Sequence, residues 1–466
     1  MRRPGWWAVG LALLFAVALS DSLLRIPIQS SDSLELILEA QRSPSVSATF
    51  VDAIGSSAYM RPLFRAQNKL IFDLAGEDSL QPAYRGVHAF LILACLTLFA
   101  TGARVRTWSD CAAFAMALGV LLGIHTFRGA VGEAYPVNHY LNVAVVCLVT
   151  LVLAQSRGGL GVDLLAVAGF VYAIFILETG ALVWVVALAA WTTGWRGISS
   201  RGLAAMTVAL AGYAILRFVL LPTGLPTLSE RSTGFLFSAL DPPELNQRFG
   251  QSPMFFYAYN VAVSFVSVLL SEPRAGRFVA TYALLHDRLT PHMLIMVTTS
   301  LLTTGAIAGV AWRAWRRRTL DDNARYLVVF GAVIAANSVV SFPYTKDEIM
   351  LPAGIFYAFA AYAAARAIVH GASLSSQAVR AVAMIVLFVV SMGWAARASG
   401  LPYFLRSQAF KQRGDWAELS TSPSTSHSAA TADELRLLQR LRDNALATGA
   451  PNPYFAPRWQ GLLWEE

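Results

Sequence analysis

The chain has 466 residues, of which 56% are hydrophobic and only 14% are charged. Soluble globular proteins carry about 25% charged residues, and the apolar residues here form repeated long runs, so the composition excludes an ordinary soluble domain and indicates a polytopic membrane protein. The net charge of +8, from 36 Lys and Arg against 28 Asp and Glu, is expected to orient helices and meet anionic lipid headgroups, with no nucleic-acid partner.

About eleven apolar runs are long enough to cross a bilayer. We interpret the first as an uncleaved helix, although its basic start and short apolar core also fit a secretory signal. A further apolar stretch at 255–270 is interpreted as a re-entrant or surface helix, because counting it as a span would put basic connections on the wrong side. The expected spans lie near residues 6–27, 86–102, 110–125, 137–155, 160–176, 180–194, 203–221, 291–312, 326–342, 351–369 and 380–399.

Arginines in the short connections predict which side of the bundle faces the cytoplasm. The remaining side then receives three substantial segments, 28–85, 222–290 and 400–466. We therefore predict a transmembrane module, 1–399, whose outer loops are the first two of these segments, followed by a short extracytoplasmic tail, 400–466. A polar helix is expected within the tail, at 433–446. The protein is expected in the inner (plasma) membrane, with its N-terminus cytoplasmic and its C-terminus outside.

Neither the cysteines nor the histidines indicate a metal centre. The three cysteines lie in or beside apolar runs and form no CxxC pair, so we expect buried free thiols rather than disulfides or a zinc site. The histidines at 88, 286 and 292 show no metal-ligand spacing.

The first outer loop carries candidate chemistry near both of its ends. Asp32, in the segment Gln29-Ser-Ser-Asp-Ser-Leu-Glu35, could accept a proton from a hydroxyl group or help to hold a divalent cation. Ser31 or Asp32 with Glu35 also fits a helix-capping box, so a purely structural role stays open. Later in the loop, Arg61-Pro62 opens a stretch with apolar residues at helical spacing, which predicts a helix lying on the membrane surface.

The connection between the third and fourth expected spans is short but dense in polar groups. It contains His125, Arg128, Glu133 and Asn138. An ordinary hairpin needs none of these side chains, so we expect some of them to act on a substrate. The alternative is a solvated turn in which Pro136 opens the next helix.

Two further connections carry isolated charged groups. Glu178 lies between two apolar runs, where a carboxylate is costly and tends to be functional. Tyr344 and Lys346 lie between the ninth and tenth expected spans, and a cation beside acids and an aromatic ring there could bind a lipid phosphate. Plain turns between spans are the alternative at both places.

Taken in chain order, these elements resemble the motifs of the GT-C superfamily of integral-membrane glycosyltransferases, which use polyprenyl-phosphate-linked sugars as donors. The likeness is to bacterial, mannosyltransferase-type members and covers residues 5–370. The matching pieces are Asp32, Tyr59-Met-Arg-Pro-Leu63, Gly76-Glu-Asp with Tyr84-Arg-Gly-Val-His88, His125 with Glu133 and Asn138, Leu177-Glu178, and Tyr344-Thr-Lys-Asp-Glu-Ile-Met-Leu-Pro-Ala-Gly354.

The resemblance implies an all-α, GT-C-like fold of about eleven spans with surface helices in the first outer loop. It also implies inverting sugar transfer, with Asp32 as general base and Glu133 positioning the acceptor. Lys346, helped by Arg61, would neutralise the leaving phosphate, and a groove between spans would hold the polyprenyl chain. The residues expected to contact substrate are Arg61, His125, Arg128, Asn138, Glu178, Tyr344 and Lys346.

The partners implied are a polyprenyl-phosphate-linked sugar, a glycan, lipid or protein acceptor, and membrane lipids. A divalent cation, Mg²⁺ or Mn²⁺, is a further possibility, with Asp32 and Glu133 as its ligands. Two other functions stay open: a transporter or flippase, and a catalytically inactive family member in cell-envelope glycan assembly. Transporters usually show broken helices and a pseudo-repeat, and the sequence has no internal symmetry, which favours the enzyme.

Overall fold

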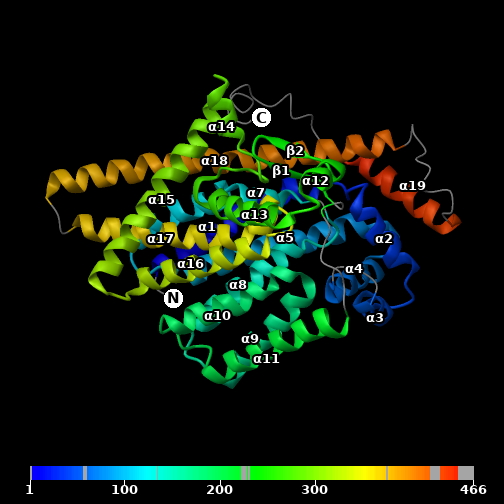
Figure 1. Ribbon diagram of the computed structural model, residues 1–466, viewed down its shortest axis with the longest axis horizontal. Coiled ribbons are helices and arrows are strands. Elements are labelled where there is room, and N and C mark those ends of the chain that lie inside the picture. Colours follow the sequence, from blue (N-terminus) through cyan, green and yellow to red (C-terminus); the bar gives the residue numbers. More distant parts are fainter. Residues whose placement is uncertain are drawn as a thin grey trace.

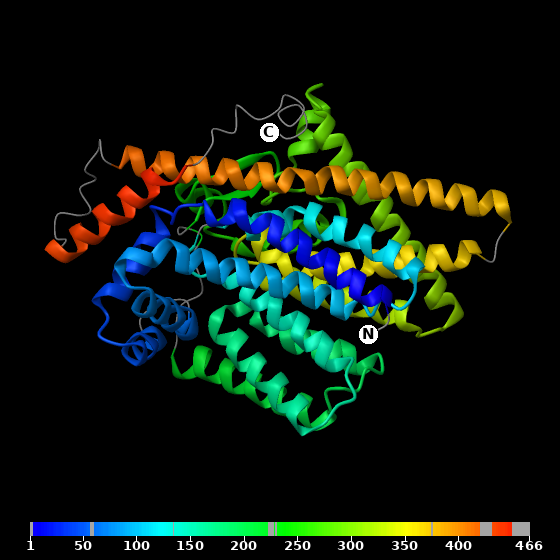
Figure 2. The same ribbon diagram turned by 180° about the vertical axis from the view of Figure 1, so that it is seen from behind.

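The computed structural model describes residues 3–55, 60–133, 135–221, 228, 231–373, 376–419 and 431–449. These residues form a bundle of mostly apolar helices (Figures 1 and 2). The elements of the bundle are α1 (Arg3–Leu24), η1 (Glu77–Ser79), α5 (Leu80–Gly102), α6 (Trp108–Gly123), α7 (His125–Gly132), α8 (His139–Ala154), α9 (Leu160–Ile176), η2 (Glu178–Ala181), α10 (Leu182–Thr192), α11 (Ser200–Ile215), η3 (Leu216–Leu220), α13 (Pro253–Leu270), α15 (Pro291–Arg317), α16 (Asp322–Val340), η5 (Asp347–Met350), α17 (Leu351–Ser373) and α18 (Gln377–Glu418).

The smaller elements lie outside this bundle. The first outer loop forms three helices, and the second forms a two-stranded antiparallel hairpin and two short helices. These elements, with the C-terminal helix, are α2 (Asp32–Arg42), α3 (Val46–Gly55), α4 (Pro62–Ala75), β1 (Thr233–Phe235), β2 (Ser238–Leu240), α12 (Pro242–Phe249), α14 (Val279–Leu285) and α19 (Ala432–Ala447). The hairpin is the one departure, among the described residues, from the expected all-α architecture.

The length and composition of the helices confirm a multi-pass membrane protein. Eight helices in the described part of the chain are long and apolar enough to cross a bilayer, or up to nine if α6 and α7, bent by 57°, form one broken span. Three further expected spans coincide with α8, α9 and α10, which are shorter. The stretch predicted to be re-entrant forms α13, which meets the length and composition of a span, so its re-entrant placement stays a prediction.

Helix α17 lies at the centre of the bundle, packed against α6, α15, α16 and α18. The most apolar stretch of this helix is 89% buried, and alanines supply much of the helix surface. Small residues let helix backbones approach closely where lipid provides no hydrophobic drive for association. Gly354 is the tightest example, because a Cβ atom there would lie 2.0 Å from the Thr126 hydroxyl oxygen of α7.

The last long helix differs from the expected span at 380–399. Helix α18 continues through Pro402 to Glu418, so the predicted start of the tail, residue 400, lies inside a helix. The polar helix expected at 433–446 is confirmed as α19, which lies beside α2–α4 at one end of the molecule (Figures 1 and 2). Arg42 of α2 is ion-paired with Glu434 of α19, and buried Leu437 and Leu441 pack α19 against the core.

The helix predicted after Arg61 is also confirmed, and its position on the membrane surface stays a prediction. Helix α4 begins with Pro62 at its first position, where a missing N–H costs nothing. Phe64 and Phe72 are buried, whereas Leu70 and Leu74 are 46% and 79% exposed. One face of α4 therefore packs on the protein, and exposed leucines remain on the other, as expected for a helix at a lipid surface.

Candidate functional site

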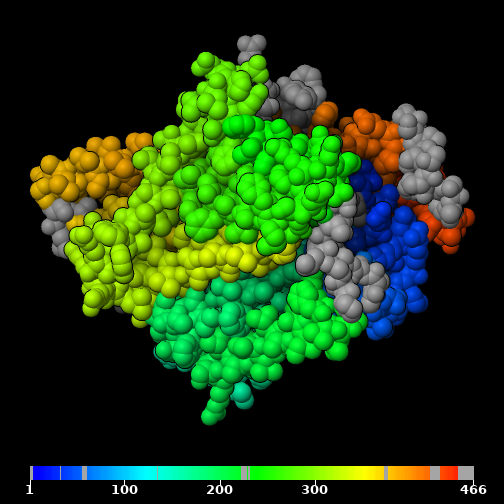
Figure 3. Space-filling model, in the orientation of Figure 1, coloured from blue at the N-terminus to red at the C-terminus, as the bar shows by residue number. Residues whose placement is uncertain are grey.

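A cavity of about 660 Å³ lies between α4, the α9–α10 junction, the end of α11 and the connection from α16 to η5. On the face shown in Figure 3, α16 lies between α13 above and the α8–α11 helices below. The charged residues that line the cavity are Glu35, Glu39, Arg61, Arg65, Glu178, Arg217 and Arg231. The cavity thus gathers four arginines from separate parts of the chain.

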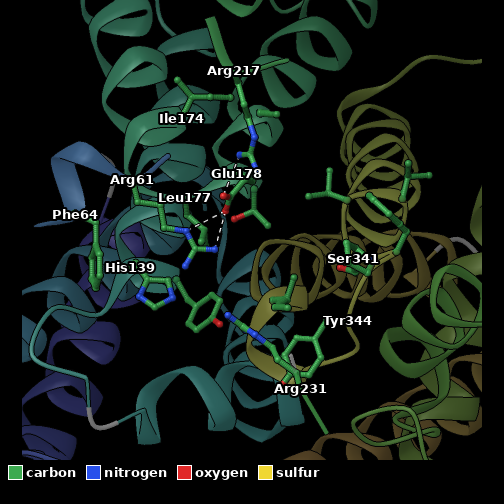
Figure 4. Close-up of a pocket in the computed structure, with 18 of the residues that line it drawn as sticks. Arg61, Phe64, His139, Ile174, Leu177, Glu178, Arg217, Arg231, Ser341 and Tyr344 are labelled. Carbon is green, nitrogen blue, oxygen red and sulfur yellow. Dashed lines mark hydrogen bonds and ion pairs between the residues drawn. The ribbon is translucent and has the colours of Figure 1, made fainter. Parts of the chain in front are cut away.

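Glu178 is the centre of a charge cluster in this cavity (Figure 4). Its carboxylate accepts hydrogen bonds from Arg61 at 2.8 and 3.1 Å and from Arg217 at 3.0 Å. Arg217 also donates to the Tyr213 hydroxyl group at 2.8 Å. Because the acid is shared by two guanidinium groups, it orients both of them at the cavity wall and leaves the cluster with an excess of positive charge.

Local breaks in the helices place the side chains of Glu178, Arg217 and Arg61 at the cavity wall. Glu178 follows Leu177, whose extended backbone ends α9 and starts the short 3₁₀ turn η2 before α10. Arg217 lies in the π-helical turn η3 that ends α11, and π turns are often found at functional sites. Arg61 precedes Pro62 at the start of α4. Each charge is therefore held by an interruption of regular helix, where a side chain can leave the helix face.

Two more arginines extend the cluster. Arg231 lies over the Tyr344 ring at 5.1 Å, and Arg65 is ion-paired with Glu39 at 2.9 Å. Figure 4 shows the guanidinium groups of Arg61 and Arg231 pointing into the cavity from opposite sides. The space between them is suited to an anion that can accept hydrogen bonds from both.

Part of the cavity wall is apolar and reaches the outer surface of the bundle. Leu210, Ala214 and Phe218 line it from α11 and η3, and Val339 and Val340 from α16. Phe218 is 57% exposed and Val339 is 59% exposed. Exposed apolar side chains on a membrane bundle are suited to contact with lipid, so the cavity combines arginines with a wall that lipid chains could reach.

A second cavity, of about 370 Å³, lies beyond Tyr344 and Thr233, which line both. Its wall is polar. It is lined by His125, Arg128, Gly129, Ser232, Thr233, Gly234, Ala239, Arg274, Ala275, Arg277, Tyr344, Thr345, Lys346, Asp347, Glu348 and Phe404. Residues of the connection between α16 and η5 line both cavities, so the two cavities are neighbours at this connection, which is termed the junction.

Lys346 lies at this junction. Its ammonium nitrogen is 3.0 Å from Glu133 and 5.9 Å from the rings of Tyr135 and Tyr140, which line the first cavity. Burial alone would lower the pKa of Lys346, but the carboxylates of Glu348 and Glu133 outweigh it and hold that pKa above its ordinary value. Lys346 therefore remains a cation throughout the working pH range.

The predicted site residues fall into separate groups. Arg61, Glu178 and Tyr344 line the first cavity, and His125, Arg128, Tyr344 and Lys346 line the second. Asn138 lines neither cavity. It is buried, contacts His88 at 3.0 Å, donates to the Ala130 carbonyl at 2.6 Å and accepts a hydrogen bond from the backbone of Leu141. This arrangement gives Asn138 a structural place at the start of α8.

Asp32 begins α2, one turn before Glu35 of the first cavity. Its side chain lies outside the described residues, so its predicted role as general base stays a prediction. The competing capping role of Ser31 is not seen, since Ser31 precedes α2 without a side-chain capping hydrogen bond.

The described residues do not fit a divalent-metal site. Within them no group of three or more His, Cys, Asp and Glu side chains is arranged to hold a metal ion. Glu133, one of the two expected ligands, is paired with Lys346, and a nearby ammonium group opposes cation binding. The described cysteines, Cys95, Cys111 and Cys147, are free thiols.

Apart from Arg65 of the predicted helix α4, sequence reasoning missed four arginines of the two cavities, Arg217, Arg231, Arg274 and Arg277. For Arg217 a signal existed, because it is a lone charge near the end of an apolar run, and intramembrane charges are often functional. The other three lie in the second outer loop, where charged residues are ordinary.

No protein-family model matches this chain, and neither a curated protein nor a solved structure is similar to it. The function must therefore be argued from the residues and their arrangement. The ordered motifs and the two neighbouring cavities are the features that bear on the function.

Proposed function

We propose that this protein is a membrane glycosyltransferase that transfers a sugar from a polyprenyl-phosphate donor to an acceptor on the extracytoplasmic side. The observation that carries the proposal is the first cavity, whose lining combines guanidinium groups with exposed apolar side chains. A lipid phosphate has the same two parts. The ordered resemblance to GT-C enzymes independently supports the same reaction class.

The donor fits this cavity in one orientation. Its phosphate lies between Arg61, Arg217 and Arg231, because charge-assisted hydrogen bonds from guanidinium groups suit phosphate oxygens. Its isoprenoid chain follows Phe218 and Val339 towards lipid. Its sugar then extends past Tyr344 to the junction with the second cavity, from which the acceptor approaches.

The reaction at this junction is a single displacement. The acceptor hydroxyl oxygen bonds to the anomeric carbon of the sugar, and the bond from that carbon to the phosphate oxygen breaks with both electrons on the phosphate. The acceptor proton passes to Asp32, the base implied by the resemblance. Lys346 and the arginines stabilise the charge that develops on the leaving phosphate. Attack from the face opposite the phosphate inverts the anomeric configuration.

Replacing Asp32 with asparagine tests the reaction class, since the amide cannot accept the proton. We expect loss of one glycan species when surface glycans of cells with wild-type protein and with Asp32→Asn are compared by mass spectrometry. Asp52→Asn is the matched control, because Asp52 is an exposed acid in the same outer loop. An unchanged glycan profile with normal expression of Asp32→Asn would remove Asp32 from catalysis.

Replacing Arg217 with methionine tests the donor site. Loss of one charge-assisted hydrogen bond is expected to weaken binding of polyprenyl phosphate by roughly 30- to 150-fold, equivalent to about 2–3 kcal/mol. Binding is measured on purified protein in micelles. Arg201→Met is the control, since Arg201 is exposed on the same helix, α11, and lines neither cavity. Equal affinities of the two variants would contradict the donor site.

The transporter alternative makes a different prediction in vesicles. If the chain moves a lipid-linked sugar without reacting it, reconstituted protein will transfer labelled donor between leaflets and leave it intact. The enzyme will instead release polyprenyl phosphate when an acceptor is present. Intact donor that has only changed leaflet would favour the transporter.

A further inference from the structure

We propose that the second cavity is the acceptor site, and that the acceptor it takes is a hydrophilic molecule bearing a carboxylate or phosphate group. That the bound molecule is a sugar acceptor rests on the proposed glycosyltransferase function.

Cationic side chains dominate the charge of this cavity. Arg128, Arg274, Arg277 and Lys346 line it, against two acids, Asp347 and Glu348. An oxyanion is the ligand that this excess of positive charge favours.

Protein contacts already occupy Asp347 and the neighbouring Glu133. Asp347 accepts hydrogen bonds from the Arg274 guanidinium at 3.2 Å and the Ala275 backbone at 2.8 Å. Lys346 is held by Glu133. Arg277 is exposed, and within the described part of the chain it has no acidic partner. Arg277 is therefore the guanidinium group best placed to receive a ligand carboxylate or phosphate.

His125 supplies an unused hydrogen-bonding group. Its side chain is 3% exposed and lines the cavity. Neither ring nitrogen has a hydrogen-bond partner among the described residues, although Nε2 lies 3.8 Å from Asp347. A buried polar atom without a partner is costly, so the histidine is suited to a hydroxyl group of a bound sugar.

The wall of this cavity is tightly built. A Cβ atom at Gly234 of β1 would lie 2.3 Å from the Ala275 carbonyl oxygen, and one at Gly276 would lie 2.5 Å from the Thr345 hydroxyl oxygen. The Tyr259 hydroxyl group donates to the Gly276 carbonyl at 2.6 Å. These contacts hold the hairpin against the 274–277 turn, so Arg277 projects from a fixed support.

Hydroxyl and backbone groups in the lining favour a ligand of a different kind from the lipid donor. Thr233 and Thr345 share a hydrogen bond of 2.8 Å and line the cavity with Ser232 and backbone groups. Phe404, beneath the Arg128 guanidinium at 4.4 Å, is the large hydrocarbon side chain of the wall. The charged and hydroxyl groups of this lining suit a water-soluble ligand or headgroup.

Glucuronate, glucose and inorganic phosphate are the probes for this site. We expect glucuronate to bind to the full-length purified protein more tightly than glucose does, as measured by saturation-transfer NMR titration. Inorganic phosphate shows whether the site takes a carboxylate only or a phosphate as well. If phosphate competes with glucuronate, the site accepts either group; if it does not compete, the site is specific for a carboxylate. Equal binding of glucose and glucuronate, or binding of neither sugar, would overturn the proposal.

Arg277→Gln is expected to weaken glucuronate binding by about tenfold or more. Arg288→Gln is the matched control, since Arg288 is an exposed arginine in the same outer segment that lines neither cavity, and it should bind as the wild type does. Unchanged affinity in Arg277→Gln would overturn the assignment of the anion to this cavity.

Polyprenyl phosphate binding is measured on the same samples, so that failure of the acidic-acceptor proposal can be distinguished from failure of the proposed donor site. If the lipid binds and glucuronate does not, the acidic-acceptor proposal alone fails. If glucuronate binds in an Arg277-dependent way but polyprenyl phosphate does not bind, the oxyanion site stands and the donor assignment fails.

Discussion

Replacing Lys346 with methionine is expected to lower the turnover number by about 10²- to 10³-fold, the usual effect of removing one preorganised electrostatic group from a transition state. Lys346 lies at the junction of the two cavities, 3.0 Å from Glu133. The Glu348 and Glu133 carboxylates outweigh burial and raise the pKa of Lys346, so the cation is available to the proposed reaction at neutral pH. Methionine keeps the unbranched side chain and removes only the charge.

Two further variants separate this loss from misfolding. Lys346→Met alone leaves Glu133 partly buried without its cation, which can reduce stability. The double variant with Glu133→Gln removes both charges, so its fold should recover while its turnover stays low. Lys346→Arg keeps the charge and should retain more activity than Lys346→Met. Full turnover in a folded Lys346→Met protein would exclude Lys346 from the reaction.

Replacing Arg397 with methionine is expected to destabilise the protein by about 3 kcal/mol or more, because several buried acceptors lose their donor at once. The side chain is 5% exposed. It donates to the Gly123 and Met296 carbonyls, each at 3.1 Å, and to hydroxyl groups of Ser300 and Ser271, each at 2.9 Å. One guanidinium group thus ties α18 to α6, α15 and the end of α13.

The effect of Arg397→Met is measured as the thermal unfolding midpoint of purified protein in micelles. Arg406→Met is the matched control, because Arg406 is exposed on the same helix, and its midpoint should stay close to that of the wild type. Similar midpoints for the two variants would show that the Arg397 bonds contribute little. Gly123 ends α6 just before His125, so Arg397→Met should also disturb the second cavity.

Local pattern was sufficient to find most of the helices. Bilayer-length apolar runs predicted the long spans, the start at Pro62 predicted α4, and polar periodicity predicted α19. These signals lie within one segment of chain. The end of α18 was missed because its continuation past Pro402 depends on contacts rather than on hydropathy: Leu405, Ala409 and Trp416 are buried, and the Trp416 indole donates to the Ile28 carbonyl at 2.6 Å.

By itself, the sequence determined that this is a multi-pass membrane protein with charged groups in particular connections, Glu178 and Lys346 among them. Only the tertiary structure decided their partners. Glu178 pairs with Arg61, 117 residues away, and with Arg217, 39 residues away, while Lys346 pairs with Glu133, 213 residues away. Hydropathy reports where each helix can form, but the pairing of charges across a cavity depends on which helices pack together and on where each of them breaks.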